Sequence, residues 1–229
     1  MLLSSRLSQL PHVSHGFFGI DYDVGQYTLN ESKNSIRLKN LMKGARFILQ
    51  DQVHTSIVNM VTQDTQSRVI GDALITQCSR VILCVRSADC APIVLAHKTK
   101  PVIAAIHAGW KGVVLQHILE KTADQLSQID DLKHYVVAIG PCLHQESFQT
   151  GAIIYNNVFN KTYFDCKRYF DFPRFIEDKL KNLGFYDVDV IPVNTSQNPY
   201  YASFRRSQGL EKKARNASLI MLRSQRDDG

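Results

Sequence analysis

Two histidines and one cysteine lie in three short segments that could carry out chemistry together. His54 ends Gln52-Val53-His54, Cys90 ends Ala88-Asp89-Cys90, and His107 opens His107-Ala108-Gly109-Trp110. Two imidazoles and a thiolate suit a zinc ion and leave its fourth position open for water or substrate, and they also suit copper. The same side chains could instead form a metal-free nucleophile pair, in which His107 activates the Cys90 thiol. Either interpretation makes this trio the candidate catalytic set.

Asp89 is the carboxylate nearest to the trio in sequence. It could accept a hydrogen bond from a ligand imidazole, or act as a general base that shuttles a proton. As the third member of a Cys–His triad it is poorly suited, because adjacent residues of a strand point to opposite faces. We therefore count Asp89 as a candidate catalytic residue of the metal site.

Buried strands must position these segments. Residues 80–85, 91–96 and 102–106 form apolar runs without alternation, which indicates strands covered on both faces. The link over residues 98–101 is too short for a parallel crossover, so the second and third runs should form an antiparallel hairpin. Cys90 starts one strand of that hairpin and His107 ends the next, which brings both residues to the same end.

The remaining pattern mixes helices and strands. Helical spacing of apolar residues predicts a helix over residues 113–127, and Asp171, Pro173 and Gly184 mark the start and end of another. Further strands are expected at residues 135–139, 188–193 and 218–222. The predicted class is α/β: a single-domain α/β/α sandwich over residues 1–229, with a mixed β-sheet covered by helices on both faces.

Composition limits the partners. A hydrophobic content of 44% over 229 residues allows a well-buried core, and the scattered basic excess of +6 favours small anions over nucleic acid. The five cysteines form no Cys-x-x-Cys pair, which indicates free thiols in a reducing compartment. Without a signal peptide or an apolar run of about 18 residues, we expect a soluble, cytoplasmic protein that does not enter membranes. Monomer and dimer both stay open.

Five histidines outside the three segments have no motif around them. We expect them at surface or turn positions; they are His12, His97, His117, His134 and His144.

Seven stretches along the chain form an ordered series. They are His15-Gly16-Phe17-Phe18, Gln52-Val53-His54, Gly71-Asp72-Ala73-Leu74-Ile75-Thr76, Ser87-Ala88-Asp89-Cys90-Ala91-Pro92-Ile93, His107-Ala108-Gly109-Trp110-Lys111-Gly112, Ile139-Gly140-Pro141-Cys142 and Tyr200-Tyr201-Ala202-Ser203-Phe204-Arg205-Arg206. In this order they resemble the multicopper polyphenol oxidase, or laccase-domain, family, which includes purine nucleoside phosphorylases. The resemblance spans nearly the whole chain.

The resemblance implies a compact α/β/α fold and a zinc site whose ligands correspond to His54, Cys90 and His107. It also implies phosphorolysis of adenosine, inosine, guanosine and methylthioadenosine, together with deamination of adenosine. The laccase name implies copper and phenol oxidation instead, although one His₂Cys site suits four-electron oxygen reduction poorly. A fold relation to cysteine hydrolases keeps a metal-free amidohydrolase open, and some bacterial relatives are described as peptidoglycan editing factors.

Candidate substrate-binding residues follow from the same stretches. Lys111, Arg205 and Arg206 are the cationic candidates for phosphate. Tyr201 and Phe204 could stack on a purine base. The chain departs from the family after Phe18, where relatives carry a Ser-Thr-Arg segment and residues 18–25 of this chain contain no arginine.

Overall fold

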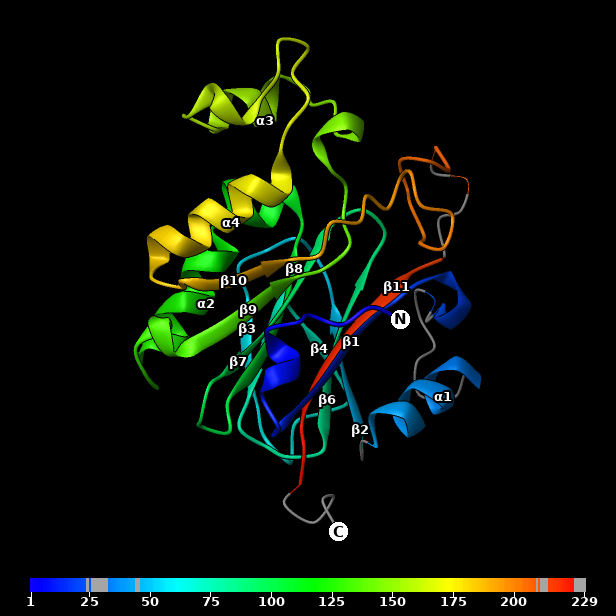
Figure 1. The fold of residues 1–229 in the computed structure, drawn as a ribbon, viewed down its shortest axis with the longest axis vertical. Coiled ribbons are helices and arrows are strands. Elements are labelled where there is room, and N and C mark those ends of the chain that lie inside the picture. The colour runs from blue at the N-terminus through cyan, green and yellow to red at the C-terminus, as the bar shows by residue number, and fades with distance from the viewer. Residues whose placement is uncertain (24, 26–32, 44–45, 209, 211–213, 225–229) are drawn as a thin grey trace.

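The apolar runs form strands that divide between two mixed sheets (Figure 1). The computed structural model describes residues 1–23, 25, 33–43, 46–208, 210 and 214–224. The five-stranded sheet has, in spatial order, β1 (Val13–Phe18), β11 (Asn216–Leu222), β6 (Val81–Ser87), β2 (Arg46–Asp51) and β4 (Arg68–Ile70). The six-stranded sheet has β10 (Asp187–Val190), β9 (Tyr135–Ile139), β7 (Ala91–His97), β8 (Ile103–Ala108), β5 (Ala73–Thr76) and β3 (Val58–Val61).

The two sheets pack face to face between helices. In β6, Leu83 and Val85 face the six-stranded sheet, whereas Ile82 and Cys84 face helix α1 (Lys33–Met42). Helices α2 (Ile118–Ser127) and α4 (Phe172–Leu183) cover the outer face of the six-stranded sheet. Both faces of each central strand are therefore dry, which explains why the strands read as unbroken apolar runs.

The predicted hairpin is confirmed. Strands β7 and β8 pair antiparallel, with Ala91 opposite Ala108 and Pro92 opposite His107. The mixed α/β class is confirmed as well, with the difference that the strands form two sheets where a single sheet was predicted.

The helix predicted over residues 113–127 is interrupted. A π-helical turn, η3 (Lys111–Leu115), comes first, and α2 begins only after His117, which adopts a left-handed backbone conformation with φ 59°. The helix after Asp171 begins and ends as predicted, because the Asp171 side chain accepts a hydrogen bond from the Arg174 N–H and Gly184 ends it with φ 111°.

The strand predicted over residues 188–193 is shorter and forms β10. Short 3₁₀ helices complete the chain, together with α3 (Ala152–Asn157); they are η1 (Leu7–Gln9), η2 (Ile20–Tyr22), η4 (Leu132–His134), η5 (Gln145–Ser147) and η6 (Lys161–Tyr163). Within the described residues, every helix is too short or too polar to cross a membrane.

Candidate metal and substrate site

Cys90 and His107 meet at one end of the β7–β8 hairpin. Cys90 immediately precedes β7, and His107 is the last residue but one of β8. The His107 ring is buried, and one of its nitrogens lies within 4.8 Å of the Cys90 sulfur. Burial opposes a charge on this ring, but the neighbouring Cys90 and Asp72 outweigh burial and raise the pKa of His107 to about 9. The thiol and the imidazole thus form an interacting pair.

His54 reaches the same place from the loop between β2 and β3. Its backbone is left-handed, with φ 58°, and its ring centroid lies 4.8 Å from that of His107. One ligand atom from each of His54, Cys90 and His107 lies within 4.8 Å of the other two. Gly109 makes this approach possible, because a Cβ there would lie 2.5 Å from His54 Nδ1 and 3.2 Å from Cys90 Sγ.

Asp72 holds both histidines in place. Its Oδ1 accepts a hydrogen bond of 2.8 Å from His107 Nδ1, which leaves His107 Nε2 for the thiol or a metal. The same carboxylate accepts hydrogen bonds from the backbone N–H groups of Val53, His54 and Thr55, at 3.3, 3.1 and 2.7 Å. These bonds fix the strained loop that carries His54.

Asp72 was quoted in the sequence only as part of a family stretch and received no role there. It is fully buried, and burial works against its charge; the hydrogen bonds from His107 and Thr55 nevertheless lower the pKa of its carboxyl. Its position directly after Gly71 is the signal that could have identified it. Gly71 has φ 151° and approaches the Ile57 carbonyl too closely for a side chain.

The trio fits a metal ion. Among the described residues, His54 Nδ1 is a buried nitrogen without a hydrogen-bond partner, so its lone pair is available. Burial, followed by the nearby His107, lowers the pKa of His54 and favours the neutral imidazole that a metal requires. Two imidazoles and a thiolate are a donor set typical of zinc, and binding of the ion would displace the proton that the raised pKa keeps on the His107 ring.

The trio lines a cavity of about 1030 Å³. Four aromatic side chains and one leucine contribute an apolar wall; they are Trp110, Phe148, Phe172, Phe204 and Leu143. Among the residues that the structure describes, five basic side chains and two acidic ones also line it; they are Arg68, Arg86, Lys111, Arg205, Arg215, Asp51 and Asp89. The cavity is therefore suited to a ligand that combines a flat apolar ring with negative charge.

Asp89 lines this cavity, and its carboxylate binds the loop that contains Thr195 and Arg205. Its backbone has φ 88°, and its two carboxylate oxygens accept hydrogen bonds from Thr195 Oγ1, at 2.7 Å, and from the Arg205 N–H, at 2.6 Å. The sequence interpretation gave Asp89 the role of supporting a ligand histidine or shuttling a proton. In the structure, Asp72 occupies the supporting position beside His107.

The three cationic residues that the sequence offered for phosphate binding differ in their surroundings. Lys111 and Arg205 line the cavity, whereas the Arg206 guanidinium donates hydrogen bonds to the carbonyls of Thr195, at 2.7 Å, and Asn198, at 2.9 Å. It also donates to the Tyr201 carbonyl at 2.5 Å. Because the guanidinium N–H groups of Arg206 bind carbonyls of its own loop, Arg206 is a weaker candidate for binding phosphate than Lys111 or Arg205.

The two aromatic candidates of the Tyr200–Arg206 stretch lie in different surroundings. The Tyr201 side chain is buried and packs near Gly19, and it is absent from the described cavity lining, whereas Phe204 is present there. Part of the segment that departs from the family pattern, Val24, lies outside the described residues.

Cys142, beside the Gly140-Pro141 turn, is buried near Cys90, and burial raises the pKa of its thiol. It therefore acts as an apolar packing residue.

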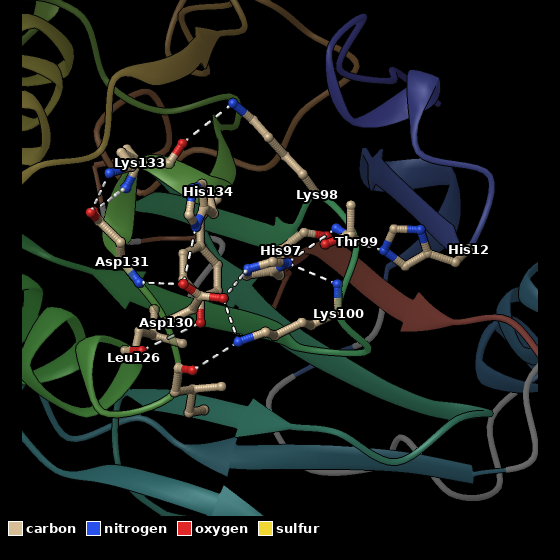
Figure 2. Close-up of polar contacts among 12 residues, drawn as sticks. His12, His97, Lys98, Thr99, Lys100, Leu126, Asp130, Asp131, Lys133 and His134 are labelled. Atoms are coloured by element: carbon tan, nitrogen blue, oxygen red, sulfur yellow. Dashed lines mark hydrogen bonds and ion pairs between the residues drawn. The ribbon is translucent and has the colours of Figure 1, made fainter.

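A second histidine group lies outside this cavity, and it corrects the expectation for His97. Figure 2 shows His97 buried between Asp130 and the following turn. Its Nδ1 accepts hydrogen bonds from the N–H groups of Thr99, at 3.1 Å, and Lys100, at 2.8 Å. The ring proton must therefore be on Nε2, which donates to Asp130 Oδ2 at 3.2 Å.

Asp130 is further engaged by the Lys100 ammonium and by His134 Nδ1 at 3.0 Å (Figure 2). A metal ion needs ligand atoms with free lone pairs. Both nitrogens of His97 are engaged in hydrogen bonds, and the Asp130 carboxylate is paired with the Lys100 ammonium, so this group does not offer them. It joins the end of β7 to the start of β9.

Comparison with known proteins identifies the family. A family model described as multi-copper polyphenol oxidoreductase laccase matches residues 11–223. The chain belongs to this family. A Rickettsia conorii protein named purine nucleoside phosphorylase is 30% identical over 210 residues, which cover 87% of this chain and 86% of the relative.

One further relative and one solved structure of similar fold extend the comparison. A protein named adenosine deaminase RL5, from an unknown prokaryotic organism, is 32% identical over 97 residues, which are 41% of this chain and 36% of that protein. The crystal structure of the Bacillus licheniformis hypothetical protein YfiH superposes with a TM-score of 0.82 at 19% identity, covering 92% of this chain and 93% of that one. The family predicted from the sequence is thus confirmed, as is its mixed α/β fold.

Proposed function

We propose that the protein is a zinc-dependent purine nucleoside phosphorylase that also deaminates adenosine. The observation that carries this proposal is the convergence of His54, Cys90 and His107 in a cavity with an aromatic wall and an excess of basic side chains. Relatives named purine nucleoside phosphorylase and adenosine deaminase support the same assignment.

Phosphorolysis places clear demands on the cavity. A phosphate oxygen bonds to the ribose C1′, the bond from C1′ to the purine nitrogen breaks, and the purine leaves with the bonding electrons and takes up a proton. Phosphate must therefore be held beside C1′ while the base stays fixed. The aromatic residues Trp110, Phe148 and Phe172 offer faces on which a purine can stack, and Lys111 and Arg205 offer charge for the phosphate.

A zinc ion held by the trio supplies Lewis-acid chemistry at neutral pH. The chain contributes the geometry. Asp72 fixes the His107 tautomer through Nδ1 and keeps His54 turned toward Cys90 through the loop N–H groups. Asp89 holds the segment from Thr195 to Arg205 over the cavity, which keeps Phe204 and Arg205 in its wall. Deamination uses the same pocket, with water adding at the purine C6 and ammonia leaving.

The test is an assay of zinc-loaded protein with adenosine, with and without phosphate, read by chromatography. We expect adenine and ribose 1-phosphate only in the presence of phosphate, and inosine also without it. Cys90→Ala should lose both activities and bound zinc, while a substitution of the exposed Cys166 by alanine, outside the described cavity lining, should keep all three. Full activity in Cys90→Ala would refute the proposal.

One observation favours a second candidate, a metal-free cysteine hydrolase acting on an amide. The Cys90 thiol lies beside the His107 ring, whose Nδ1 is hydrogen bonded to Asp72, which is the order of nucleophile, base and orienting acid in a cysteine hydrolase. The Asp72 contact removes the objection that applied to Asp89 as the third member. Activity that survives a strong chelator, and that Cys90→Ala abolishes, would favour this hydrolase over the zinc enzyme.

A further inference from the structure

The side chain of Gln52 binds the main chain of a strand that is distant in the sequence. Its Nε2 donates a hydrogen bond to the Arg86 carbonyl at 2.6 Å, and its Oε1 accepts one from the Arg86 N–H at 2.9 Å. Because an N–H can only donate and a carbonyl can only accept, these two bonds also fix which way the amide is turned. The sequence indicated no role for Gln52, which begins the segment that ends in His54.

The two hydrogen bonds lie where strands β2 and β6 separate. The parallel pairing of these strands runs from Arg46 opposite Val81 to Leu49 opposite Cys84. Gln52 follows the last residue of β2 and reaches Arg86, the last residue but one of β6. Its side chain therefore continues the connection between the two strands beyond their last backbone pair.

Each of the two strands leads to a residue of the metal trio. Gln52 lies two residues before His54, and Arg86 lies four residues before Cys90. The two segments are strained, because His54 has φ 58° and Asp89, which precedes Cys90, has φ 88°. Backbone of this kind persists only where its surroundings hold it firmly. The contact between Gln52 and Arg86 is a support that both segments share.

We propose that Gln52 is a positioning residue of the metal site, which sets the separation of His54 from Cys90 through the Arg86 main chain. This inference rests on the proposed function, because it concerns the zinc site of that enzyme. Gln52 lines the cavity, but both ends of its amide are engaged by Arg86, so it acts on the site through the backbone.

With Gln52, each pair of the trio has a connection of its own. Asp72 joins the His54 loop to His107 through hydrogen bonds. The antiparallel pairing of β7 and β8 joins Cys90 to His107. Gln52 joins the remaining pair, His54 and Cys90. Because three separations fix a triangle, the three donors are held in place before a metal ion arrives, which is the condition for tight binding.

The experiment replaces Gln52 by glutamate and by methionine and measures the bound metal. Glutamate keeps the length of the side chain but sets an oxygen against the Arg86 carbonyl, whereas methionine keeps the bulk and loses both bonds. Zinc affinity, from competition with a chromophoric chelator, should fall about 10-fold in each variant, the lower end of the loss found when a partner behind a metal ligand is removed. The visible absorption of the cobalt-substituted protein, which depends on the geometry of the ligands, should change in each.

Gln145→Glu is the matched control. The Gln145 amide also donates to a backbone carbonyl, that of Tyr169 at 3.3 Å, and it lies outside the described cavity lining. Its zinc affinity and cobalt spectrum should equal those of the wild type. If both Gln52 variants lower only the free energy of unfolding of the metal-free protein, with zinc affinity and cobalt spectrum unchanged, the inference is overturned. Gln52→Met decides the question if Gln52→Glu does not fold.

The outcomes separate the positioning role from the proposed function. Weaker zinc binding and a changed cobalt spectrum in the Gln52 variants, without nucleoside cleavage by the wild type, would support the positioning role and refute the phosphorylase. Nucleoside cleavage by the wild type, with variants that bind zinc equally tightly, would overturn the positioning role and leave the phosphorylase intact. Wild-type protein that binds neither zinc nor cobalt would overturn both the inference and the zinc dependence.

Discussion

Substituting Gly109 by alanine tests the metal site without removing a ligand. The new Cβ would lie 2.5 Å from His54 Nδ1, 2.8 Å from His54 Cε1 and 3.2 Å from Cys90 Sγ. The backbone of Gly109 lies outside the left-handed region, so alanine adds no backbone strain. The effect of Gly109→Ala should therefore be steric and confined to the two ligands.

The structure gives the size of the disturbance. To reach ordinary contact, His54 Nδ1 must retreat from 2.5 to 3.4 Å, a movement of about 0.9 Å. A zinc–nitrogen distance tolerates a change of only about 0.2 Å. We expect Gly109→Ala to weaken zinc binding by about 10- to 100-fold, the range found when a group that orients a zinc ligand is disturbed.

The assay is a competition titration of zinc between the protein and a chromophoric chelator. Gly151→Ala is the matched control, because a Cβ at Gly151 meets nothing within 4 Å, and its zinc affinity should equal that of the wild type. Equal affinity in Gly109→Ala and the wild type would mean that His54 is not a ligand, and the reasoning would fail.

Three other substitutions test separate parts of the account. Asp72→Asn should weaken zinc binding by about 10- to 100-fold in the same titration, because the amide cannot accept every hydrogen bond from the His54 loop; unchanged affinity would remove its positioning role. His15 is buried and accepts the Ser4 N–H, and burial lowers its pKa from 6.5 to about 4. The unfolded chain therefore takes up a proton first as the pH falls from 6.5 to about 4, which costs about 3 kcal/mol of stability. In urea unfolding, the free energy of unfolding of His15→Gln should fall less than that of the wild type as the pH is lowered from 6.5 to about 4. An equal fall in the two proteins would contradict this. Arg206→Gln should lower the free energy of unfolding by about 1 to 2 kcal/mol with zinc affinity unchanged, since its donors hold the loop; a raised KM for phosphate without lost stability would restore its predicted role.

The sequence predicts the hairpin that assembles the site because its signals are local. Apolar runs and a short turn predict β7 and β8, and strand direction then brings Cys90 and His107 together. Asp171 and Gly184 predict the ends of α4 for the same reason, since capping depends on nearby residues. The number of sheets could not be predicted, because a strand covered by a helix and one covered by another sheet show the same unbroken apolar pattern.

Roles that depend on distant contacts could not be predicted. Asp72 lies 35 residues from His107 and 18 from His54; the preceding Gly71 marks the position as unusual but does not indicate that Asp72 contacts both histidine segments. The arginines show the same limit. From the sequence, a basic residue could equally bind phosphate or hold a loop. Only the fold shows that Arg215 lines the cavity, whereas Arg206 binds backbone carbonyls.

The most direct test of the central claim is X-ray absorption at the zinc edge of the purified, zinc-loaded protein. Ligation by His54, Cys90 and His107 predicts one sulfur at about 2.3 Å and two imidazole nitrogens at about 2.0 to 2.1 Å. In Cys90→Ala the sulfur shell should disappear. A zinc shell without sulfur in the wild type, or a sulfur shell that persists in Cys90→Ala, would contradict the account.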